Sequence, residues 1–217
     1  MRKYKLTDET RAVNGTTLYR IEALRDFNNV KAGDKGGFVR SEENLSHRGT
    51  CWVYDNAIAT DCTRIMDDAA LHGHASMCGH SAMWEHSDMY NYAAMWDYSS
   101  MWDYAAMWDY SSMFDFTSMR HHASLHDYAS MWEHSEMYNY ASMWDDASMW
   151  DYAAMYNYAS MWGRSAMRDH AAMWEYSSMW DSASMWDHAA MYNYAAMRNH
   201  AVIRWHEVLR GHGVRSI

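Results

Sequence analysis

The feature that most constrains this sequence is a six-residue repeat, which runs without a break from residue 53 to residue 203. With Met83 taken as the first position of a hexad, 26 first positions fall between Val53 and Ile203, and every one is apolar. The fifth position of each hexad in this span is always Ala, Ser or Thr. One large and one small residue, both suited to a core, therefore recur at a fixed spacing.

This period excludes a helical rod. An α-helix has 3.6 residues per turn, so a period of six would spread the first positions around every side of the helix. A coiled coil needs a period of seven. A strand alternates in twos, and the third position is Asp, Glu, Asn or Gly nearly throughout, which are turn formers that tolerate positive φ. Each hexad is therefore predicted to be a short strand followed by a corner.

Fixed periods of this kind are typical of solenoids. Three hexads make a triangular coil of 18 residues, so the predicted fold is all-β, a left-handed parallel β-helix with eight to nine coils. At about 4.8 Å per coil the prism is roughly 40 Å long. Left-handed winding opposes the usual crossover rule, but the hexapeptide period is specific to it, and a pentapeptide prism is excluded. We predict an N-terminal cap over residues 1–50, the β-helix over 51–203 and a C-terminal cap over 204–217.

The two ends of the chain are not repetitive. Tyr4–Leu6 and Leu18–Ile21 are predicted strands, and Asn14–Gly15 between them is a hairpin turn signal. We expect this segment to cover the exposed strand edges of the first coil. The glycine-rich stretch 33–37 lacks the ending of a phosphate-binding loop and is predicted to be a turn. After Ile203 the sequence fits either one more strand pair or a short amphipathic helix, and both remain open.

Part of the chain resembles a known family. The residues are Leu24–Val39 (LRDFNNVKAGDKGGFV), Asn44–Ser46 and Cys51–Ala57 (CWVYDNA). They are similar to bacterial and phage proteins that have a short N-terminal cap followed by hexapeptide repeats of the type Val-Tyr-Gly-Asn-Ala-Arg. The resemblance covers about residues 15–60. It implies a left-handed β-helix, common in phage and prophage genomes and often labelled transferase-like by fold. This chain departs from the family with Met at position one, Trp or Tyr at position two, and mostly Ala or Ser at position six.

Charge is segregated along the chain. Residues 51–197 carry four Lys or Arg and twenty Asp or Glu, whereas the flanking segments are each mildly basic, and the net charge is −10. An acidic rod repels phosphates, so we expect no direct binding of nucleic acid. The sequence has no long apolar stretch, so we expect no membrane partner. Met1–Leu6 lacks an apolar signal region, which predicts a cytoplasmic protein or a component of a phage particle. Cys51, Cys62 and Cys78 are expected to be isolated reduced thiols.

Aromatic and acidic columns provide the candidate site. If positions two and four face outward, their rings stack from coil to coil at the strand spacing, and these ladders either support the rod itself or serve association with a partner. A partner would be a second copy of the chain or another protein. The predicted interaction face consists of Trp84, Trp96, Trp102, Trp108, Trp132, Trp144, Trp150, Trp162, Trp174, Trp180 and Trp186, with Asp97, Asp103, Asp109, Asp151, Asp181 and Asp187.

The histidines do not indicate a catalytic or metal site. They alternate with Tyr at positions two and four, and no loop interrupts the repeat to form the wall of a cleft. His72 with His74, and His121 with His122 and His126, are the groupings that a metal could use, but neither completes a four-ligand set. We therefore expect no catalytic residue, no metal and no cofactor, and a chain that is not an enzyme.

The predicted function is a non-catalytic structural or interaction protein of phage or prophage type, which uses its aromatic and acidic columns for self-association or docking. Two alternatives remain. Columns of carboxylates could mimic a nucleic-acid backbone and inhibit a DNA-binding protein. Hexapeptide prisms also often host acyl transfer from coenzyme A, so an acyltransferase-like enzyme with its site at an oligomer seam is the second alternative.

Overall fold

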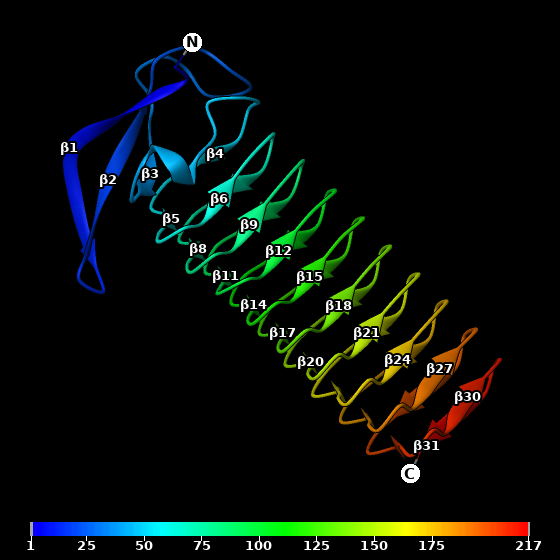
Figure 1. Ribbon diagram of the computed structural model, residues 1–217. Helices are drawn as coiled ribbons and strands as arrows, with labels where there is room; N and C mark the ends of the chain where they lie inside the picture. The colour runs from blue at the N-terminus through cyan, green and yellow to red at the C-terminus, as the bar shows by residue number, and fades with distance from the viewer. Residues whose placement is uncertain (1, 217) are drawn as a thin grey trace.

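The computed structural model describes residues 2–216 and shows a parallel β-helix preceded by a β-hairpin (Figure 1). Strands β1 (Tyr4–Val13) and β2 (Thr16–Ala23) form the antiparallel hairpin, and β3 (Lys35–Val39) pairs with β2. A single 3₁₀ turn, η1 (Glu42–Asn44), follows. The hairpin turns at Asn14 and Gly15, which both have positive φ, so the turn predicted from this dipeptide is confirmed.

Three parallel sheets form the sides of the helix, and each strand pairs with the strand 18 residues later. The first sheet continues β1, β2 and β3 through β5 (Ile58–Ala59), β8 (Ser76–Met77), β11 (Ala94–Met95), β14 (Ser112–Met113), β17 (Ser130–Met131), β20 (Ser148–Met149), β23 (Ala166–Met167), β26 (Ser184–Met185) and β29 (Val202–Ile203).

The second sheet contains β4 (Trp52–Val53), β7 (Ala70–Leu71), β10 (Asp88–Met89), β13 (Ala106–Met107), β16 (Ser124–Leu125), β19 (Ser142–Met143), β22 (Ser160–Met161), β25 (Ser178–Met179), β28 (Ala196–Arg198) and β31 (Val214–Ser216). The third sheet contains β6 (Arg64–Ile65), β9 (Ala82–Met83), β12 (Ser100–Met101), β15 (Ser118–Met119), β18 (Glu136–Met137), β21 (Ala154–Met155), β24 (Ala172–Met173), β27 (Ala190–Tyr192) and β30 (Val208–Arg210).

The core follows the hexad pattern. The first-position side chains are fully buried along the whole rod, for example Met101 and Met149, and the fifth positions beside them are buried as well. Corners fall at positions three and four, where Asp, Asn and Glu adopt positive φ. The predicted left-handed β-helix with 18 residues per coil is confirmed.

The rod has about ten turns, as the ten strands of the second sheet show, rather than eight to nine. The difference arises at the C-terminal end, because strands β30 and β31 continue the coil into the region expected to close it. Of the two alternatives for residues 202–210, the structure adopts the strand pair, β29 and β30.

Candidate functional site in the first coils

A groove of about 580 Å³ lies on the second sheet, where the loop after β2 meets the first coils. We call it the N-terminal groove. Side chains from the loop, from the segment before β4 and from successive coils line it: Asn28, Asn29, Thr50, Tyr54, Asp68, Ala70, His72, His86 and Asp88. The spacing of 18 explains the gathering, because residues 54 and 72, 68 and 86, and 70 and 88 occupy equivalent places on adjacent coils.

Asp68 and His86 form the first pair of the groove. The Asp68 carboxylate accepts hydrogen bonds from the Thr50 hydroxyl (2.7 Å) and the Thr50 amide (2.8 Å), and these bonds lower its pKa. The carboxylate is therefore ionised and fixed in place at neutral pH. His86 Nε2 lies 3.8 Å from Asp68 Oδ2, and the imidazole stacks on Tyr104. The groove therefore places an imidazole nitrogen beside a fixed carboxylate.

His72 and Asp88 form the opposite side of the groove. The His72 ring is stacked between Tyr54 and Tyr90, with centroid distances of 4.4 and 4.7 Å, and burial lowers its pKa. Burial also raises the pKa of Asp88, which accepts a hydrogen bond of 3.1 Å from the Tyr90 hydroxyl. The groove thus combines a neutral imidazole with a carboxyl group that is harder to ionise than usual. Such perturbed groups are typical of functional sites.

Space for a ligand arises from a break in the repeat. Asp88 occupies a sixth position, and its neighbours on the sheet, Ala70 and Ala106, are small. The wall is completed by Asn29, whose side-chain oxygen accepts a 2.6 Å hydrogen bond from the Tyr54 hydroxyl. Thr50, Asp68, His86 and Asp88 were not among the residues predicted from the sequence, although the offset of 18 residues and the carboxylate at position six were visible signals.

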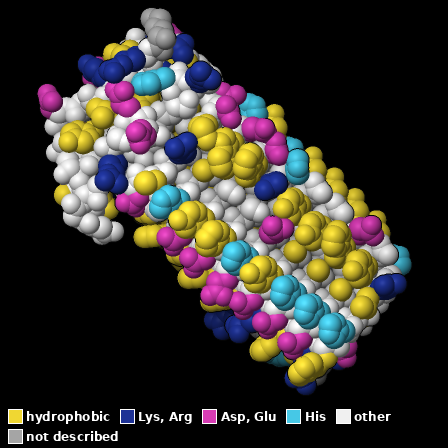
Figure 2. All heavy atoms as spheres, in the orientation of Figure 1, with side chains coloured by type: hydrophobic (Ala, Val, Ile, Leu, Met, Phe, Trp, Pro, Cys, Tyr) yellow, Lys and Arg dark blue, Asp and Glu magenta, His cyan; other side chains and the backbone are white. Residues whose placement is uncertain are grey.

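The predicted tryptophans do not share one face. Trp96, Trp132, Trp150 and Trp186 border the first sheet; Trp108, Trp144, Trp162 and Trp180 border the second; Trp84, Trp102 and Trp174 border the third. Figure 2 shows apolar and histidine side chains running in rows along the visible side of the rod.

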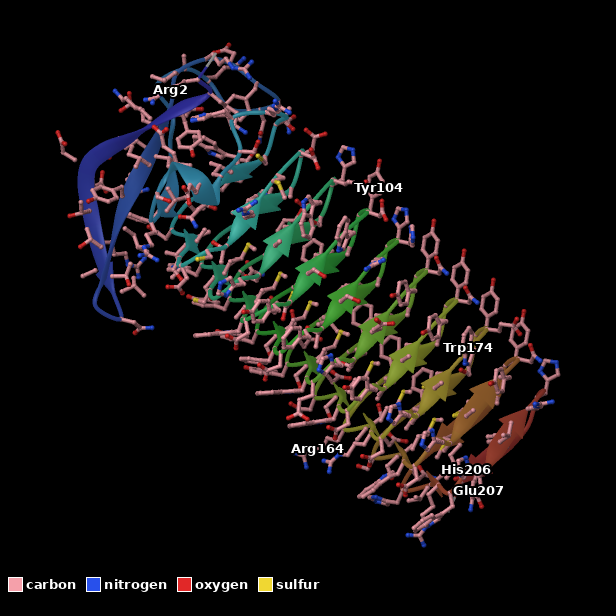
Figure 3. All side chains as sticks on the ribbon, in the orientation of Figure 1. Arg2, Tyr104, Arg164, Trp174, His206 and Glu207 are labelled. Atoms are coloured by element: carbon pink, nitrogen blue, oxygen red, sulfur yellow. The ribbon has the colours of Figure 1, made fainter. Side chains whose placement is uncertain are left out.

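Stacking determines how much of each tryptophan a partner can reach. Trp84 stacks on Trp102 at 4.0 Å and Trp162 on Trp180 at 5.2 Å, so neighbouring rings occupy each other's faces. Four members of the set reach exposures of 36% to 39%, and the others are half-buried: Trp96, Trp108, Trp180 and Trp186 are the exposed ones. The columns therefore support the rod through their ring faces and present their edges outward. Figure 3 labels Trp174, a member of the column along the third sheet.

The predicted aspartates all lie at corners with positive φ. Asp97 and Asp181 are exposed, and Asp103, Asp109, Asp151 and Asp187 are half-buried. Self-association or docking through these columns, the lack of direct nucleic-acid binding and inhibition by nucleic-acid mimicry stay predictions.

The histidines of the two predicted groupings belong to different stacked columns. His72 stacks on Tyr54, whereas His74 stacks on Tyr92 at a corner. In the second grouping His122 stacks on Tyr104, and His126 belongs to the column of Trp144. Within residues 2–216, no group of three or more His, Cys, Asp or Glu is arranged to hold a metal ion. That part of the chain also contains no helix with the length and apolarity of a membrane span.

Comparison with known proteins gives one partial relative. No family model matches the chain. An "Uncharacterized acetyltransferase YdcK" of Escherichia coli (strain K12) is 42% identical over 88 residues, which cover 34% of this chain and 27% of the relative. The chain thus spans about a quarter of the length of that protein. A UDP-N-acetylglucosamine acyltransferase from Campylobacter jejuni superposes with a TM-score of 0.40 at 5% identity, over 78% of this chain and 68% of that one.

The expectation that the chain is not an enzyme is wrong, because a relative at 42% identity is named an acetyltransferase. The expectation depended on the lack of a loop within the repeat that could wall a cleft. The structure does contain such a wall: the loop with Asn28 and Asn29 lies before the repeat and folds back against its first coils.

Proposed function

We propose that this protein is an acyltransferase whose active site is the N-terminal groove, with His86 as the general base. The observation that carries the proposal is the pairing of His86 with an ionised, hydrogen-bonded Asp68 inside a groove. The partial relative named an acetyltransferase supports the reaction class. The site lies within a single chain, which replaces the oligomer seam of the sequence-based alternative.

The chemistry needs one proton acceptor and one fixed anion. His86 removes a proton from the ammonium group of the acceptor, and the free amine attacks the carbonyl carbon of an acyl thioester. The new C–N bond forms and the C–S bond breaks. The leaving thiolate takes the proton from the imidazolium, and the second proton of the nitrogen goes to solvent. Asp68 stabilises the imidazolium formed in between, and positioned acid–base catalysis of this kind contributes roughly 10²- to 10⁴-fold.

The charge of the groove selects the acceptor. Asp68 and Asp88 line it, and no Lys or Arg is among its described lining residues. A phosphorylated acceptor would be repelled, whereas an ammonium group is attracted by the carboxylates and by the faces of aromatic rings. Burial raises the pKa of Asp88, and a cation bound beside it would act in the opposite direction and favour its carboxylate form. The acceptor class is therefore a cationic amine.

The test compares two histidines of one column. His86→Gln removes the base from the groove, while His122→Gln removes an imidazole from the equivalent corner two coils further along, where it stacks between Tyr104 and Tyr140. With acetyl-CoA and a polyamine such as spermidine, we expect His86→Gln to lose about 10²-fold or more in kcat/KM. His122→Gln should retain the wild-type rate.

Two results would contradict the proposal. One is an absence of acetyl transfer by the wild-type chain to a panel of amines and alcohols. The other is equal activity of the two variants, which would separate catalysis from the groove.

A further inference from the structure

Lys3 is a fully buried amine with an unusual partner. Its side chain has no solvent exposure, and Nζ lies 2.7 Å from the carbonyl oxygen and 3.1 Å from Sγ of Cys51. The next nearest acceptor is the carbonyl of Arg48 at 3.5 Å. Among residues 2–216 no carboxylate lies within ion-pair distance of Lys3, and Asp68 acts on it only from further away. Nζ also lies 5.3 Å from the centre of the Phe27 ring, so carbonyl oxygens, a thiol and an aromatic face surround the amine.

The surroundings change the reactivity of both groups. Burial lowers the pKa of Lys3, which favours the neutral, nucleophilic amine. Burial raises the pKa of the Cys51 thiol, and the adjacent Lys3 amine acts against that rise. The proposed acyl transfer uses neither residue.

We propose that peroxide converts this pair into a covalent bond between Lys3 Nζ and Cys51 Sγ, a sulfenamide. Hydrogen peroxide first oxidises the thiol to a sulfenic acid and releases one water. The Lys3 amine then attacks the sulfur, the N–S bond forms, and the S–O bond breaks. The departing hydroxide leaves as a second water with a proton from nitrogen. The sulfur is oxidised and the peroxide is reduced, so the electrons balance.

The geometry favours condensation over further oxidation. Reacting atoms separated by about 3–3.5 Å are in a near-attack arrangement, and the 3.1 Å contact falls in that range. Two hydrogen bonds fix the backbone of Lys3: its amide donates to Nδ1 of His47, and the Leu24 amide donates to its carbonyl oxygen. Cys51 is fully buried, and the preceding residue, Thr50, lines the N-terminal groove.

The bond would tie two segments that are 48 residues apart. Lys3 immediately precedes β1, and Cys51 immediately precedes β4, the first strand of the rod in the second sheet. Oxidation would therefore clamp the hairpin to the first coil, and with it the residues that wall the groove. Reduction by a thiol would release it.

The test treats the folded chain with hydrogen peroxide and maps peptides by mass spectrometry. A Cys62→Ser/Cys78→Ser variant serves as the starting protein, so that Cys51 is the remaining thiol. We expect a Lys3–Cys51 peptide pair that is lighter than the sum of its parts by two hydrogens and disappears with dithiothreitol. The melting temperature should rise with the cross-linked fraction. The same treatment in guanidinium chloride should give no link, because unfolding separates the pair.

Several outcomes would overturn the inference. These are Cys51 recovered as a free thiol, Cys51 oxidised to sulfinic acid with Lys3 unmodified, or equal linkage in the folded and denatured chain. Lys3→Met adds a check that does not depend on stability, since it should convert the linked product into sulfinic acid. The readout is covalent mass, so the inference stands or falls separately from acyl transfer.

Discussion

The first coils, residues 51–82, and the uniform rod from Met83 onward share one period but differ in what surrounds it. In the first coils the inward residues vary, from Val53 and Ala59 to Ile65 and Leu71. The N-terminal segment packs on them, with β3 paired to β5. In the rod nearly every first-position residue is Met, and the outer surface includes columns of stacked rings.

The corners differ as well. At Asp55 only the third position has positive φ, and the Asn56 amide donates forward to Gly73 on the next coil. At Asn157 and Tyr158 both residues have positive φ, and the Tyr158 amide donates back to Asn139 on the preceding coil. Both arrangements satisfy the corner amide, so the fold tolerates either turn. The comparison teaches that regular repeats build the scaffold, whereas the irregular coils beside the cap make the groove.

The largest expected difference between the two regions concerns glycines. A Cβ at Gly37 in β3 would collide with the Ala57 carbonyl oxygen and the Val53 side chain, where the cap meets the first coil. Gly37→Ala should therefore destabilise the protein by about 3 kcal/mol. Denaturant unfolding monitored by circular dichroism measures this change.

The matched substitution in the rod is Gly211→Asn, at the corner of the last coil. Gly211 has φ of +69°, and a Cβ there would meet no atom of the described residues within 4 Å. Because Asn193 already occupies the equivalent corner of the preceding coil with positive φ, this change should stay within about 0.5 kcal/mol. An equal loss of stability in the two variants would mean that Gly37 is packed no more tightly than a corner glycine of the rod.

The second expected effect is the stability that the protein loses when one ring is removed from a stacked column. Tyr158 lies between Tyr140 and Tyr176, with both centroid distances at 4.8 Å and interplanar angles of 2°. Tyr158→Ala removes two ring pairs and should cost about 1–3 kcal/mol, at 0.5–1.5 kcal/mol per pair. Tyr158→Phe keeps the ring and should be close to neutral. Thermal unfolding of both variants gives the difference.

The corresponding corner residue in the first coils is Asn56, which offers no ring to a neighbour. Asn56→Ala should change stability by no more than about 0.5 kcal/mol. A cost for Asn56→Ala equal to that of Tyr158→Ala would show that ring stacking contributes little to the rod.

The sequence was sufficient to predict the scaffold, because its period admits few folds. Burial of Met101 and Met149, the turn at Asn14–Gly15 and the positive φ of corner aspartates all follow from residue type and spacing. The backbone conformation of each corner could not be predicted from residue type and spacing. Asp97–Tyr98 and Asp151–Tyr152 are the same dipeptide, yet positive φ occurs at Asp97 alone in the first and at both residues in the second. The dipeptide alone therefore does not decide between the two conformations.

The candidate site was harder to predict. It depends on the loop at Asn28 and Asn29 folding onto coils that follow it by more than 20 residues, which periodicity does not describe. The sequence predicted that the tryptophan rings stack from coil to coil, but not how much of each ring stays exposed; Trp84 and Trp102 are half-buried. Residues that break the repeat, such as Asp88, would have been a better guide to the site than the residues that repeat most often.

The smallest expected effect is that one carboxyl group in the cap and one in the rod change the stability of the fold with pH in opposite directions. In the cap, hydrogen bonds from Lys35 and Arg20 lower the pKa of Glu9 below its ordinary 4.5. The ionised Glu9 therefore stabilises the folded state at neutral pH, and this stabilisation is lost as the pH falls through the lowered pKa. In the rod, a shared proton with Asp151 raises the pKa of Glu133 above 4.5. Glu133 does not destabilise the folded state in acid, because it is protonated in both the folded and the unfolded chain. The destabilisation appears as the pH rises through the raised pKa.

Two glutamine variants separate these signs. Near neutral pH, Glu9→Gln should lower the melting temperature relative to wild type, whereas Glu133→Gln should raise it slightly, because it removes a like-charge contact with Asp151. Both differences should vanish well below pH 4.5, where the wild-type carboxyls are protonated. Both groups are exposed to solvent, so added salt should shrink both effects. A lower melting temperature for Glu133→Gln at neutral pH would show that the corner carboxylates stabilise the rod instead of opposing it.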